Sequence, residues 1–271
     1  MPACVRPVLL PVRMLGGRLM NDLPANPLRE IFRDGWLLAV HKPAGLLLHR
    51  SPIDRHETEF ALQYARALNG GAHVYPLHRL DRPTSGLLLF ARDAQTASLL
   101  GKAFMAGEVH KEYLALVRGW PAEQGLIEHA LREQAVDRRC KEDPQPLREA
   151  STSFRRLATT ELPVAIEGYP CSRYSLLALT PHSGRKHQLR RHMQHISHPI
   201  IGDTNYGRTR HNHYFAERFG GGRLMLAATG MGFVHPHTGQ PMQLRAAPEE
   251  SFMRVLSIFQ QGLPVDLSDK A

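Results

Sequence analysis

The chain has 271 residues, of which 42% are hydrophobic, and its formal net charge is +9. This composition argues against an intrinsically disordered chain, and the length suits one large domain or two small ones. The sequence pI near 9.8 favours a polyanionic partner such as nucleic acid, although a merely basic enzyme would show the same charge.

Cysteine usage and hydropathy bear on the compartment. Cys4, Cys140 and Cys171 are far apart and odd in number, which argues against a disulfide framework and favours the reducing cytoplasm. No apolar run approaches the roughly 18 residues that a membrane-spanning helix needs. We therefore expect a cytoplasmic protein that does not enter a membrane.

The first 27 residues are expected to form a disordered lead, because prolines and glycines recur through them. The apolar stretch Val8-Leu9-Leu10 is too short for the core of a signal peptide. Translation in the cell could begin at Met14 or Met20. Residues 28–262 are expected to form the folded domain, followed by a short tail over 263–271.

Hydrophobic periodicity predicts the elements of the folded region. The expected strands, in chain order, cover residues 31–32, 36–40, 87–91, 109–118, 174–179, 224–234 and 242–246. The expected helices cover residues 57–68, 94–106, 185–196 and 252–259. An Asp34-Gly35 turn joins the first two strands as a hairpin, and Asp93 and Gly107 bracket the second helix.

The order of these elements predicts the fold class. Strands come in groups with helices between them, and the two types do not alternate regularly. That order favours an α+β fold with a mixed, largely antiparallel sheet flanked by helices. The polar stretch 132–151, which holds Pro144 and Pro146, is expected to be a mobile connection within one domain.

The most informative segment is the loop His78-Arg79-Leu80-Asp81-Arg82-Pro83-Thr84-Ser85-Gly86, which runs directly into an apolar strand. It places one carboxylate, Asp81, between two arginines where Pro83 and Gly86 force a turn. An enzyme with a polyanionic substrate and a carboxylate nucleophile would need such a loop. Ser85 lacks the setting of a serine nucleophile and is read as a turn residue.

A second informative segment is rich in cations. From Gly168 to Gly202 there is no acidic residue, whereas five residues are Lys or Arg and five are His. Leu189, Met193 and Ile196 give the expected helix one apolar face, so the arginines are expected on other faces. Cations at a helix start are unfavourable, and phosphate is the expected compensating anion. A solvated basic face is the alternative.

The histidines of this region suggest a metal site only weakly. His192, His195 and His198 repeat every three residues, but no cysteine pair stands nearby and no HExxH motif is present. We therefore expect no metal. RNA contact or an ordinary surface position is the favoured reading of these histidines.

Together these segments resemble the RluA-type pseudouridine synthases. The resemblance runs over about residues 28–260. It rests on His78 to Ala91, on Lys111-Glu112-Tyr113-Leu114-Ala115, on Gly184 to Arg190, and on Arg223-Leu224-Met225-Leu226. It implies an isomerase that needs no cofactor, and the chain shows neither a Rossmann glycine motif nor a P-loop.

The resemblance also implies roles for individual residues. Asp81 would attack C1′ of the nucleoside or remove a sugar proton, Tyr113 would stack on the flipped uracil and help remove the C5 proton, and Arg190 would pair with Asp81 and keep it ionised. Arg79 would fill the place of the flipped base. The substrate-binding residues implied are Arg79, Arg82, Thr84, Arg185, Lys186, His187 and Leu226.

The RNA substrate is a further expectation. Within the family the segments 157–163, 185–192 and 198–203 look most like members that act on tRNA, which implies uridine 65 near the junction of the acceptor and T stems. A monomer without a second RNA-binding domain is expected. Three alternatives stay open: a synthase for large-subunit ribosomal RNA, a non-catalytic RNA-binding module and a metal-dependent hydrolase.

One departure from the family pattern stands at Ala227. The family usually has Leu-His-Ala where this chain has Leu226-Ala227-Ala228. Any role of that histidine is absent here, and we expect the role to be structural.

Overall fold

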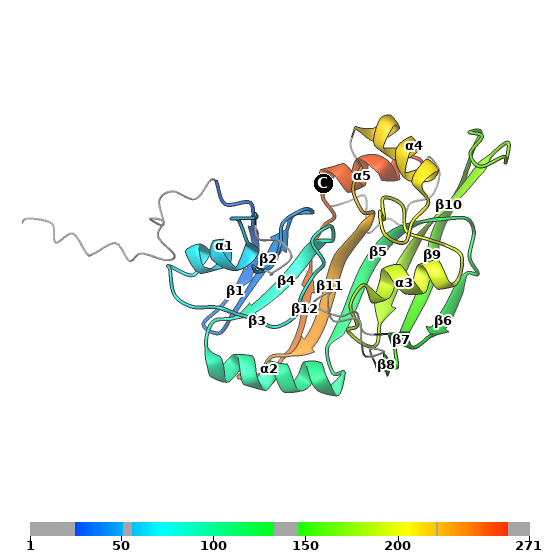
Figure 1. Ribbon diagram of the computed structural model, residues 1–271. Coiled ribbons are helices and arrows are strands. Elements are labelled where there is room, and N and C mark those ends of the chain that lie inside the picture. The colour runs from blue at the N-terminus through cyan, green and yellow to red at the C-terminus, as the bar shows by residue number, and fades with distance from the viewer. Residues whose placement is uncertain (1–24, 51–55, 133–145, 221, 260–271) are drawn as a thin grey trace, which may run out of the picture.

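The computed structural model describes residues 25–50, 56–132, 146–220 and 222–259. Within these ranges a sheet of ten strands runs through the molecule, with five helices around it and a separate two-stranded ribbon (Figure 1). The strands are β1 (Arg29–Arg33), β2 (Leu37–Lys42), β3 (Tyr75–Pro76), β4 (Ser85–Ala91), β5 (His110–Arg118), β6 (Gln124–Glu128), β7 (Leu131–Arg132), β8 (Leu147–Arg148), β9 (Ser151–Leu162), β10 (Ser172–Pro181), β11 (Leu226–Val234) and β12 (Pro241–Arg245). The helices are α1 (Ala61–Leu68), α2 (Ala94–Ala106), α3 (Gln188–His195), α4 (Thr209–Phe219) and α5 (Glu250–Leu256).

The sheet has the order β1-β2-β4-β11-β5-β10-β9-β6, with β3 on β4 and β12 on β11. Every pair of named strands is antiparallel except β4 with β11, so the sheet is mixed and largely antiparallel. Figure 1 shows α1 and α2 with the half that holds β2 and β4, and α3 across β10 and β9. The predicted α+β class is confirmed.

The parallel contact between β4 and β11 joins the two halves of the sheet. It is short, because Ala227 aligns with Ser85 and Ala228 with Gly86 and no further pair follows. Gly86 has a φ of +110°, and a Cβ placed there would lie 2.1 Å from the carbonyl oxygen of Ala228. Only glycine therefore lets the two backbones approach this closely.

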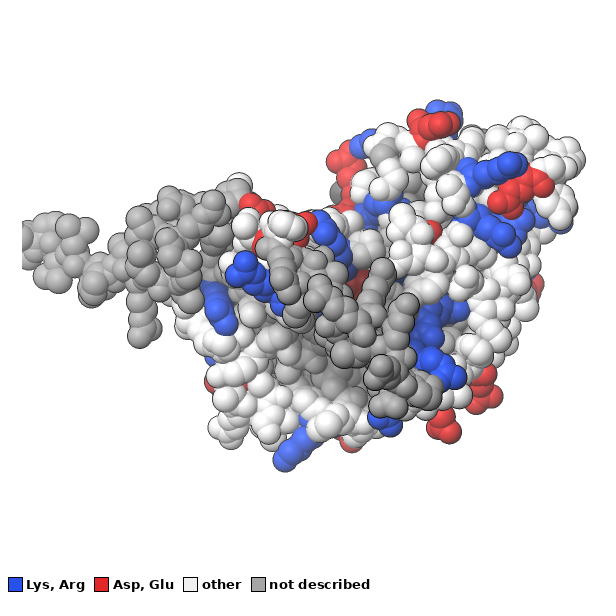
Figure 2. Space-filling model, viewed as in Figure 1, with Lys and Arg blue, Asp and Glu red and all other residues white. Residues whose placement is uncertain are grey.

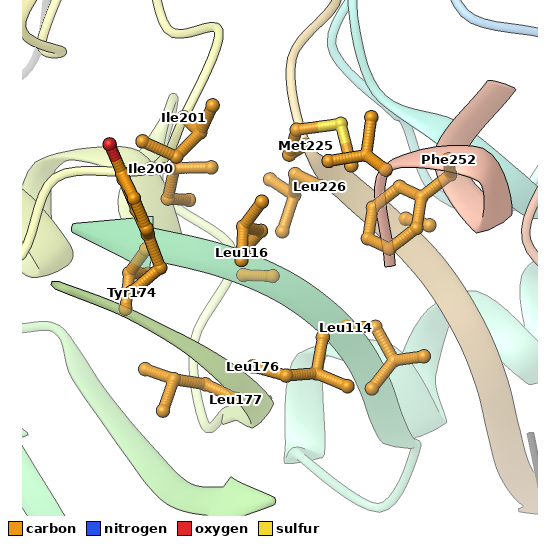
Figure 3. Close-up of a cluster of buried hydrophobic side chains, with 14 of the residues drawn as sticks. Leu114, Leu116, Tyr174, Leu176, Leu177, Ile200, Ile201, Met225, Leu226 and Phe252 are labelled. Atoms are coloured by element: carbon orange, nitrogen blue, oxygen red, sulfur yellow. The ribbon is translucent and has the colours of Figure 1, made fainter. Parts of the chain in front are cut away.

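The buried apolar side chains form two clusters, one in each half. The first packs β5 and β10 against α3, α4 and α5, and Figure 3 shows part of it around Leu116, Tyr174 and Phe252. The second packs β2 and β4 against α1 and α2. Tyr113 of β5 packs against both clusters, so it stands where the two halves of the core meet.

Most of the expected elements are present. The hairpin forms around Asp34 as β1 and β2, and α2 covers the predicted 94–106. The carboxylate of Asp93 accepts from the Thr96 amide and Gly107 ends the helix with a φ of +76°. These are the capping roles that the two residues were predicted to fill.

Two expected helices begin later than predicted, and the backbone shows why. Phe60 is extended and pairs with Leu47, so α1 begins at Ala61 instead of residue 57. His187 has a φ of +55°, so α3 begins at Gln188 instead of residue 185. Both differences reflect a residue with non-helical backbone at the helix start.

The sequence analysis missed α4 and the strands β3, β6, β7, β8 and β9. A register shift in the pairing of β9 with β10 falls between Leu176 and Leu177, and it breaks the alternation that would have revealed β9. No side chain caps the start of α4, which removes the usual start signal. The spacing of Phe215 and Phe219 and the following Gly220 were the available signs of this helix.

Parts of the expected lead, tail and connection lie outside the described residues. Of the lead, residues 25–27 are described, and Asn26 donates to the Tyr64 carbonyl at 3.2 Å. Of the polar connection, Leu147 and Arg148 form β8, which pairs with β7. The boundaries at 28 and 262 stay predictions.

Replacing Gly86 with alanine should destabilise the fold strongly. The new Cβ meets the Ala228 backbone and the positive φ is strained, so we expect a loss of at least about 3 kcal/mol in the free energy of unfolding. Gly101→Ala in α2 is the matched control, because nothing lies within 4 Å of its Cβ position. The control should be neutral or gain up to about 1 kcal/mol. Urea unfolding of both variants measures the difference, and equal stabilities would contradict the role given to Gly86.

Candidate active site

The loop that carries Asp81 is closed on itself and tied to β4. The Thr84 amide donates to the Asp81 carbonyl at 3.0 Å, which fixes the turn ahead of β4. At the start of the loop, the His78 Nε2 accepts from the Leu89 amide at 3.1 Å. Burial lowers the pKa of His78 to about 3, so its ring is neutral and can accept this bond. The Asp81 carboxylate therefore stands on a rigid support.

A buried lysine fastens the other side of the loop. The side chain of Lys42, at the end of β2, is fully buried and donates to the carbonyls of Pro43, Leu46 and Arg82 at 2.9, 2.8 and 3.2 Å. Three acceptors match the three donors of a protonated ammonium group. Burial lowers the pKa of Lys42 to about 7, against the nearby charges of Glu249 and Asp81, which act to raise it.

Arg190 of α3 lies between two carboxylates. It donates to Asp203 through Nε at 2.7 Å and through Nη2 at 2.8 Å, whereas its Nη1 lies 3.4 Å from the Asp81 carboxylate. Arg190 is only 4% exposed and the Asp203 side chain is fully buried. The pairing with Asp81 expected for Arg190 is thus present, but the tighter partner is Asp203.

The structure adds an unexpected partner for a cation of α3. The arginines were expected away from the apolar face of Leu189, Met193 and Ile196, with phosphate compensating the cations at the helix start. The charge of Arg190 is compensated by the carboxylates of Asp203 and Asp81, of which only Asp81 was expected. Helical spacing shows which residues share a face and cannot show that a buried carboxylate lies on another loop.

Asp203 is the site residue that the sequence analysis missed. Burial acts to raise the pKa of Asp203, but the hydrogen bonds and charge of Arg190, together with the amides of Tyr206 and Asn205, outweigh it and the pKa is lowered. The amides of Asn205 and Tyr206 also donate to its Oδ1, at 2.9 and 3.0 Å. The available signal was its position, because Asp203 is the first acid after the acid-free segment 168–202.

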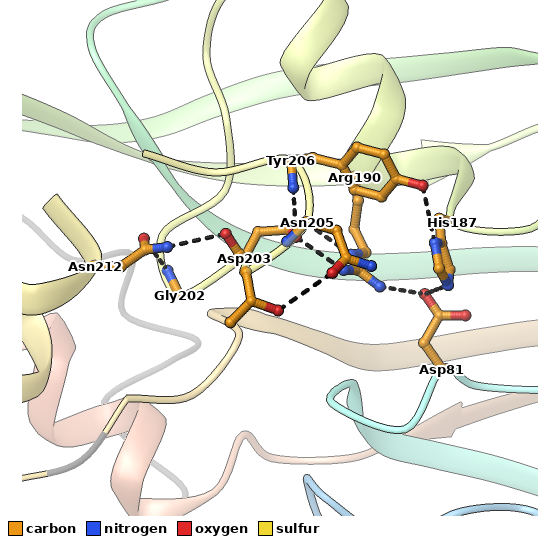
Figure 4. Close-up of polar contacts among 9 residues, drawn as sticks. Asp81, His187, Arg190, Gly202, Asp203, Asn205, Tyr206 and Asn212 are labelled. Carbon is orange, nitrogen blue, oxygen red and sulfur yellow. Dashed lines mark hydrogen bonds and ion pairs between the residues drawn. The ribbon is translucent and has the colours of Figure 1, made fainter. Parts of the chain in front are cut away.

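His187 completes the polar cluster. Its Nε2 lies 3.9 Å from the Asp81 Oδ2, and its Nδ1 lies 3.1 Å from the Tyr206 hydroxyl (Figure 4). Burial, with the charges of Arg190 and Lys186, lowers the pKa of His187 despite the carboxylate of Asp81. The neutral ring of His187 therefore lies beside the Asp81 carboxylate. Asp203 lies on the other side of Arg190 (Figure 4).

Tyr113 lies close enough to Asp81 to sense its charge. Burial, and then the negative charge of Asp81, raise the pKa of the Tyr113 phenol. The hydroxyl therefore keeps its proton at neutral pH. Since Tyr113 also packs against both apolar clusters, it lies where the two halves of the core meet.

Four of the predicted substrate-binding cations are exposed around this cluster. Arg79 and Arg82 flank Asp81, and Arg185 and Lys186 precede α3. Arg82 is held by Glu57, whose Oε1 lies 2.6 Å from Nη2, and by the Gly45 carbonyl. Lys and Arg side chains gather over the face that α3 covers (Figure 2).

Two other predicted substrate-binding residues lie in the core. Thr84 is 2% exposed and Leu226 is 3% exposed. Leu226 is paired with Ala115 of β5, and Ala227 with Ser85 of β4. The side chains of Thr84 and Leu226 are therefore buried, and the departure at Ala227 lies at the junction of the two halves of the sheet.

Among the described residues, no three His, Cys, Asp or Glu side chains come together in a group that could hold a metal ion. No helix in the described part of the chain is long and apolar enough to cross a membrane.

Comparisons with known proteins identify this arrangement. A family model described as RNA pseudouridylate synthase matches residues 36–195, a range that holds Asp81, Tyr113 and Arg190. The chain belongs to the RluA-type family of RNA pseudouridylate synthases. These enzymes isomerise uridine to pseudouridine, so this pseudouridine synthase is an isomerase.

Curated relatives of this pseudouridine synthase cover nearly its whole folded region. It is 46% identical over 235 residues to "tRNA pseudouridine synthase C" of Vibrio cholerae, which covers 86% of this chain and 96% of that protein. It is also 46% identical over 239 residues to the protein of the same name from Pasteurella multocida, covering 87% and 98%.

A solved structure shares the fold of this pseudouridine synthase at low sequence identity. Human RNA pseudouridylate synthase domain containing 4 superposes with a TM-score of 0.64 at 21% identity, covering 86% of this chain and 93% of that one. The likeness supports the predicted fold and says nothing further about the substrate.

Replacing Asp203 with asparagine should destabilise the protein, because Asp81, at the longer distance, is then the one carboxylate that still contacts Arg190. Breaking a buried ion pair costs about 3 kcal/mol. The lowered pKa of Asp203 means that its stabilisation is present above the unfolded value of about 3.9 and is lost as pH falls through the folded value. The free energy of unfolding, measured with urea from pH 7 to pH 3, should therefore fall less on acidification for Asp203→Asn than for the wild type. An unchanged profile would contradict the pairing.

Proposed function

We propose that this enzyme converts uridine to pseudouridine in tRNA, and that its target is uridine 65 in the acceptor and T-stem region. The observation that carries the substrate class is the similarity over almost the whole folded region to relatives named for tRNA. The exposed cations around Asp81 fit a polyanionic substrate. A single catalytic domain over residues 28–262, active as a cytoplasmic monomer, is part of the proposal.

The reaction breaks the N1–C1′ bond, turns the base and joins C5 to C1′, while a proton leaves C5 and a proton is gained at N1. No electrons are exchanged, so no redox group is required. We assign the first step to Asp81, which either attacks C1′ or removes a sugar proton. Arg190 lies 3.4 Å from this carboxylate and supports its charged form.

The base must leave the RNA helix before Asp81 can reach it. Arg79 is exposed beside Asp81, and its planar guanidinium can occupy the vacated stack. Tyr113 offers its ring to the flipped uracil. Since the Tyr113 hydroxyl is protonated, it can accept the C5 proton only if it donates its own proton to another group at the same time.

Asp81→Asn should abolish isomerisation while RNA binding stays nearly intact. Asp81 is the carboxylate of the loop, and its charge opposes phosphate, so its removal does not weaken binding. We expect turnover to fall on the order of 10³-fold or more. A tritium-release assay and filter binding on the same tRNA transcript test both parts. Near wild-type turnover would show that another group starts the reaction.

Tyr113→Phe should slow turnover by about 10²-fold and change the Kd for RNA little. The phenylalanine ring keeps the stacking surface and the contacts with both apolar clusters, and only the hydroxyl is lost. Single-turnover rates give the first quantity and fluorescence anisotropy the second. Equal losses in rate and affinity would indicate a purely structural tyrosine.

The substrate is decided by incubating the protein with separate tRNA and large-subunit ribosomal RNA transcripts and mapping pseudouridine in each. We expect modification of tRNA at uridine 65, and binding that weakens steeply with salt because several phosphates are neutralised. A tRNA with uridine 65 replaced by cytidine is the control. Modification confined to ribosomal RNA would overturn the tRNA proposal and leave the family membership intact.

A further inference from the structure

A second group of cationic and titratable side chains lies beside the Asp81 cluster, on the flank of α3 that faces β6 and β7. It consists of His129, Arg132, Arg191 and His195, which we call the His129 patch. None of these residues contacts Asp81 in the structure, and none has a part in the mechanism above. His195 and Arg132 are exposed, and His129 and Arg191 are partly exposed.

The two imidazoles of the patch are stacked. The ring centroids of His129 and His195 lie 3.8 Å apart, with an angle of 14° between the planes. Buried His192 fixes the base of the stack, because its Nε2 lies 3.0 Å from the His129 carbonyl and its Nδ1 lies 2.9 Å from the Thr152 hydroxyl. The stack is therefore held by the fold and does not depend on a ligand.

Arg191 is placed next to the stack by a backbone contact. Its Nη1 donates to the Arg132 carbonyl at 3.0 Å, which uses one of the five N–H donors of the guanidinium. Arg191 and His195 are one helical turn apart on α3, so both side chains lie on the same flank. The guanidinium of Arg191 and two imidazoles thus lie on one small area, and the backbone of Arg132 borders it.

The groups around His129 disfavour a proton on its ring. Burial, then His195, then Arg191 lower the pKa of His129, and all three causes act in the same direction. An anion bound among these groups would reverse the electrostatic part of the shift. Such an anion would bind more tightly when His129 is protonated.

Other charged and titratable groups lie on the elements around the patch. They are His192, Arg185 and Lys186 on or before α3, Glu128 on β6, and Arg148 and Glu149 on or after β8. Glu128 pairs with Ser151, whereas Ile127 pairs with Thr152 on the α3 side, so the Glu128 side chain is on the opposite face of the sheet. Glu149 accepts Arg185 through its carbonyl, which draws a cation toward the α3 face.

We propose that the His129 patch is a phosphate-binding site for the RNA backbone, distinct from the Asp81 cluster, and that RNA binding there takes up a proton. The proposal rests on the RNA-modifying function given above. Arg190, which contacts Asp81, precedes His195 by five residues on the same helix, so the patch lies only about 7.5 Å further along the axis. An RNA strand with its target nucleotide at Asp81 can therefore continue over α3 and place a neighbouring phosphate on the patch.

The test measures the Kd for a tRNA transcript by fluorescence anisotropy from pH 5.5 to pH 8 at constant ionic strength. Wild type should bind more tightly as pH falls, by about fivefold over this range, and one linked proton allows at most about tenfold per pH unit. His195→Gln and the double variant His129→Gln/His195→Gln should reduce this dependence. The matched control is His213→Gln, because His213 is an exposed histidine on α4.

The number of protons taken up when RNA binds is obtained from the binding enthalpies measured by calorimetry in two buffers of different ionisation enthalpy. Wild type and His213→Gln should take up more protons on binding than the double variant does. Arg191→Gln should weaken binding at every pH and lower the slope of log K against log salt by about one. His195→Gln changes an exposed side chain, so it keeps the test decisive even if the double variant fails to fold.

The outcomes separate this proposal from the tRNA assignment. If the patch variants keep the wild-type pH dependence and proton uptake, the patch proposal is wrong, whichever RNA is modified. If the patch variants lose that dependence but pseudouridine forms only in ribosomal RNA, the patch stands and the tRNA assignment fails.

Discussion

The site depends on the buried guanidinium of Arg190, which makes two short hydrogen bonds to one carboxylate and one longer contact to another. Arg190 is removed from water, so it must be paired, and Asp203 pairs with it through two short hydrogen bonds. Asp81 receives only the third, longer contact at 3.4 Å. Because Asp203 accepts two hydrogen bonds from Arg190, the Asp81 carboxylate keeps lone pairs that the arginine does not use. It still lies beside the positive charge of Arg190. A single carboxylate facing Arg190 would be bound too completely to react as readily.

Much of the fold and of this site could be predicted from the sequence. The hairpin at Asp34, the capped helix over 94–106 and the α+β class follow from short-range patterns that local physics determines. The grouping of Asp81, His187 and Arg190 was anticipated in part, because each belongs to a motif recognisable without knowledge of the fold. Their assigned roles stay proposals that the experiments above address.

The features that could not be predicted depend on contacts between distant segments. Lys42 follows the expected strand 36–40 in the sequence, yet the fold places it at the end of β2 and buries it against the carbonyl of Arg82. Asp203 becomes the partner of Arg190 only when the loop after α3 folds back. The register shift near Leu176 conceals β9, since a bulge moves side chains to the other face without changing composition.

The distances along the chain have a consequence for how the protein is made. Asp81 and its arginine are separated by 109 residues, and Ser85 and Arg223, which joins it at the sheet junction, by 138. A growing chain that has completed its first half holds the Asp81 loop without either contact. The second apolar cluster also contains Met231 and Phe233 of β11, so neither that cluster nor the site is complete until β11 emerges and closes the sheet. During synthesis, activity therefore appears near the end and reports that the whole domain has folded.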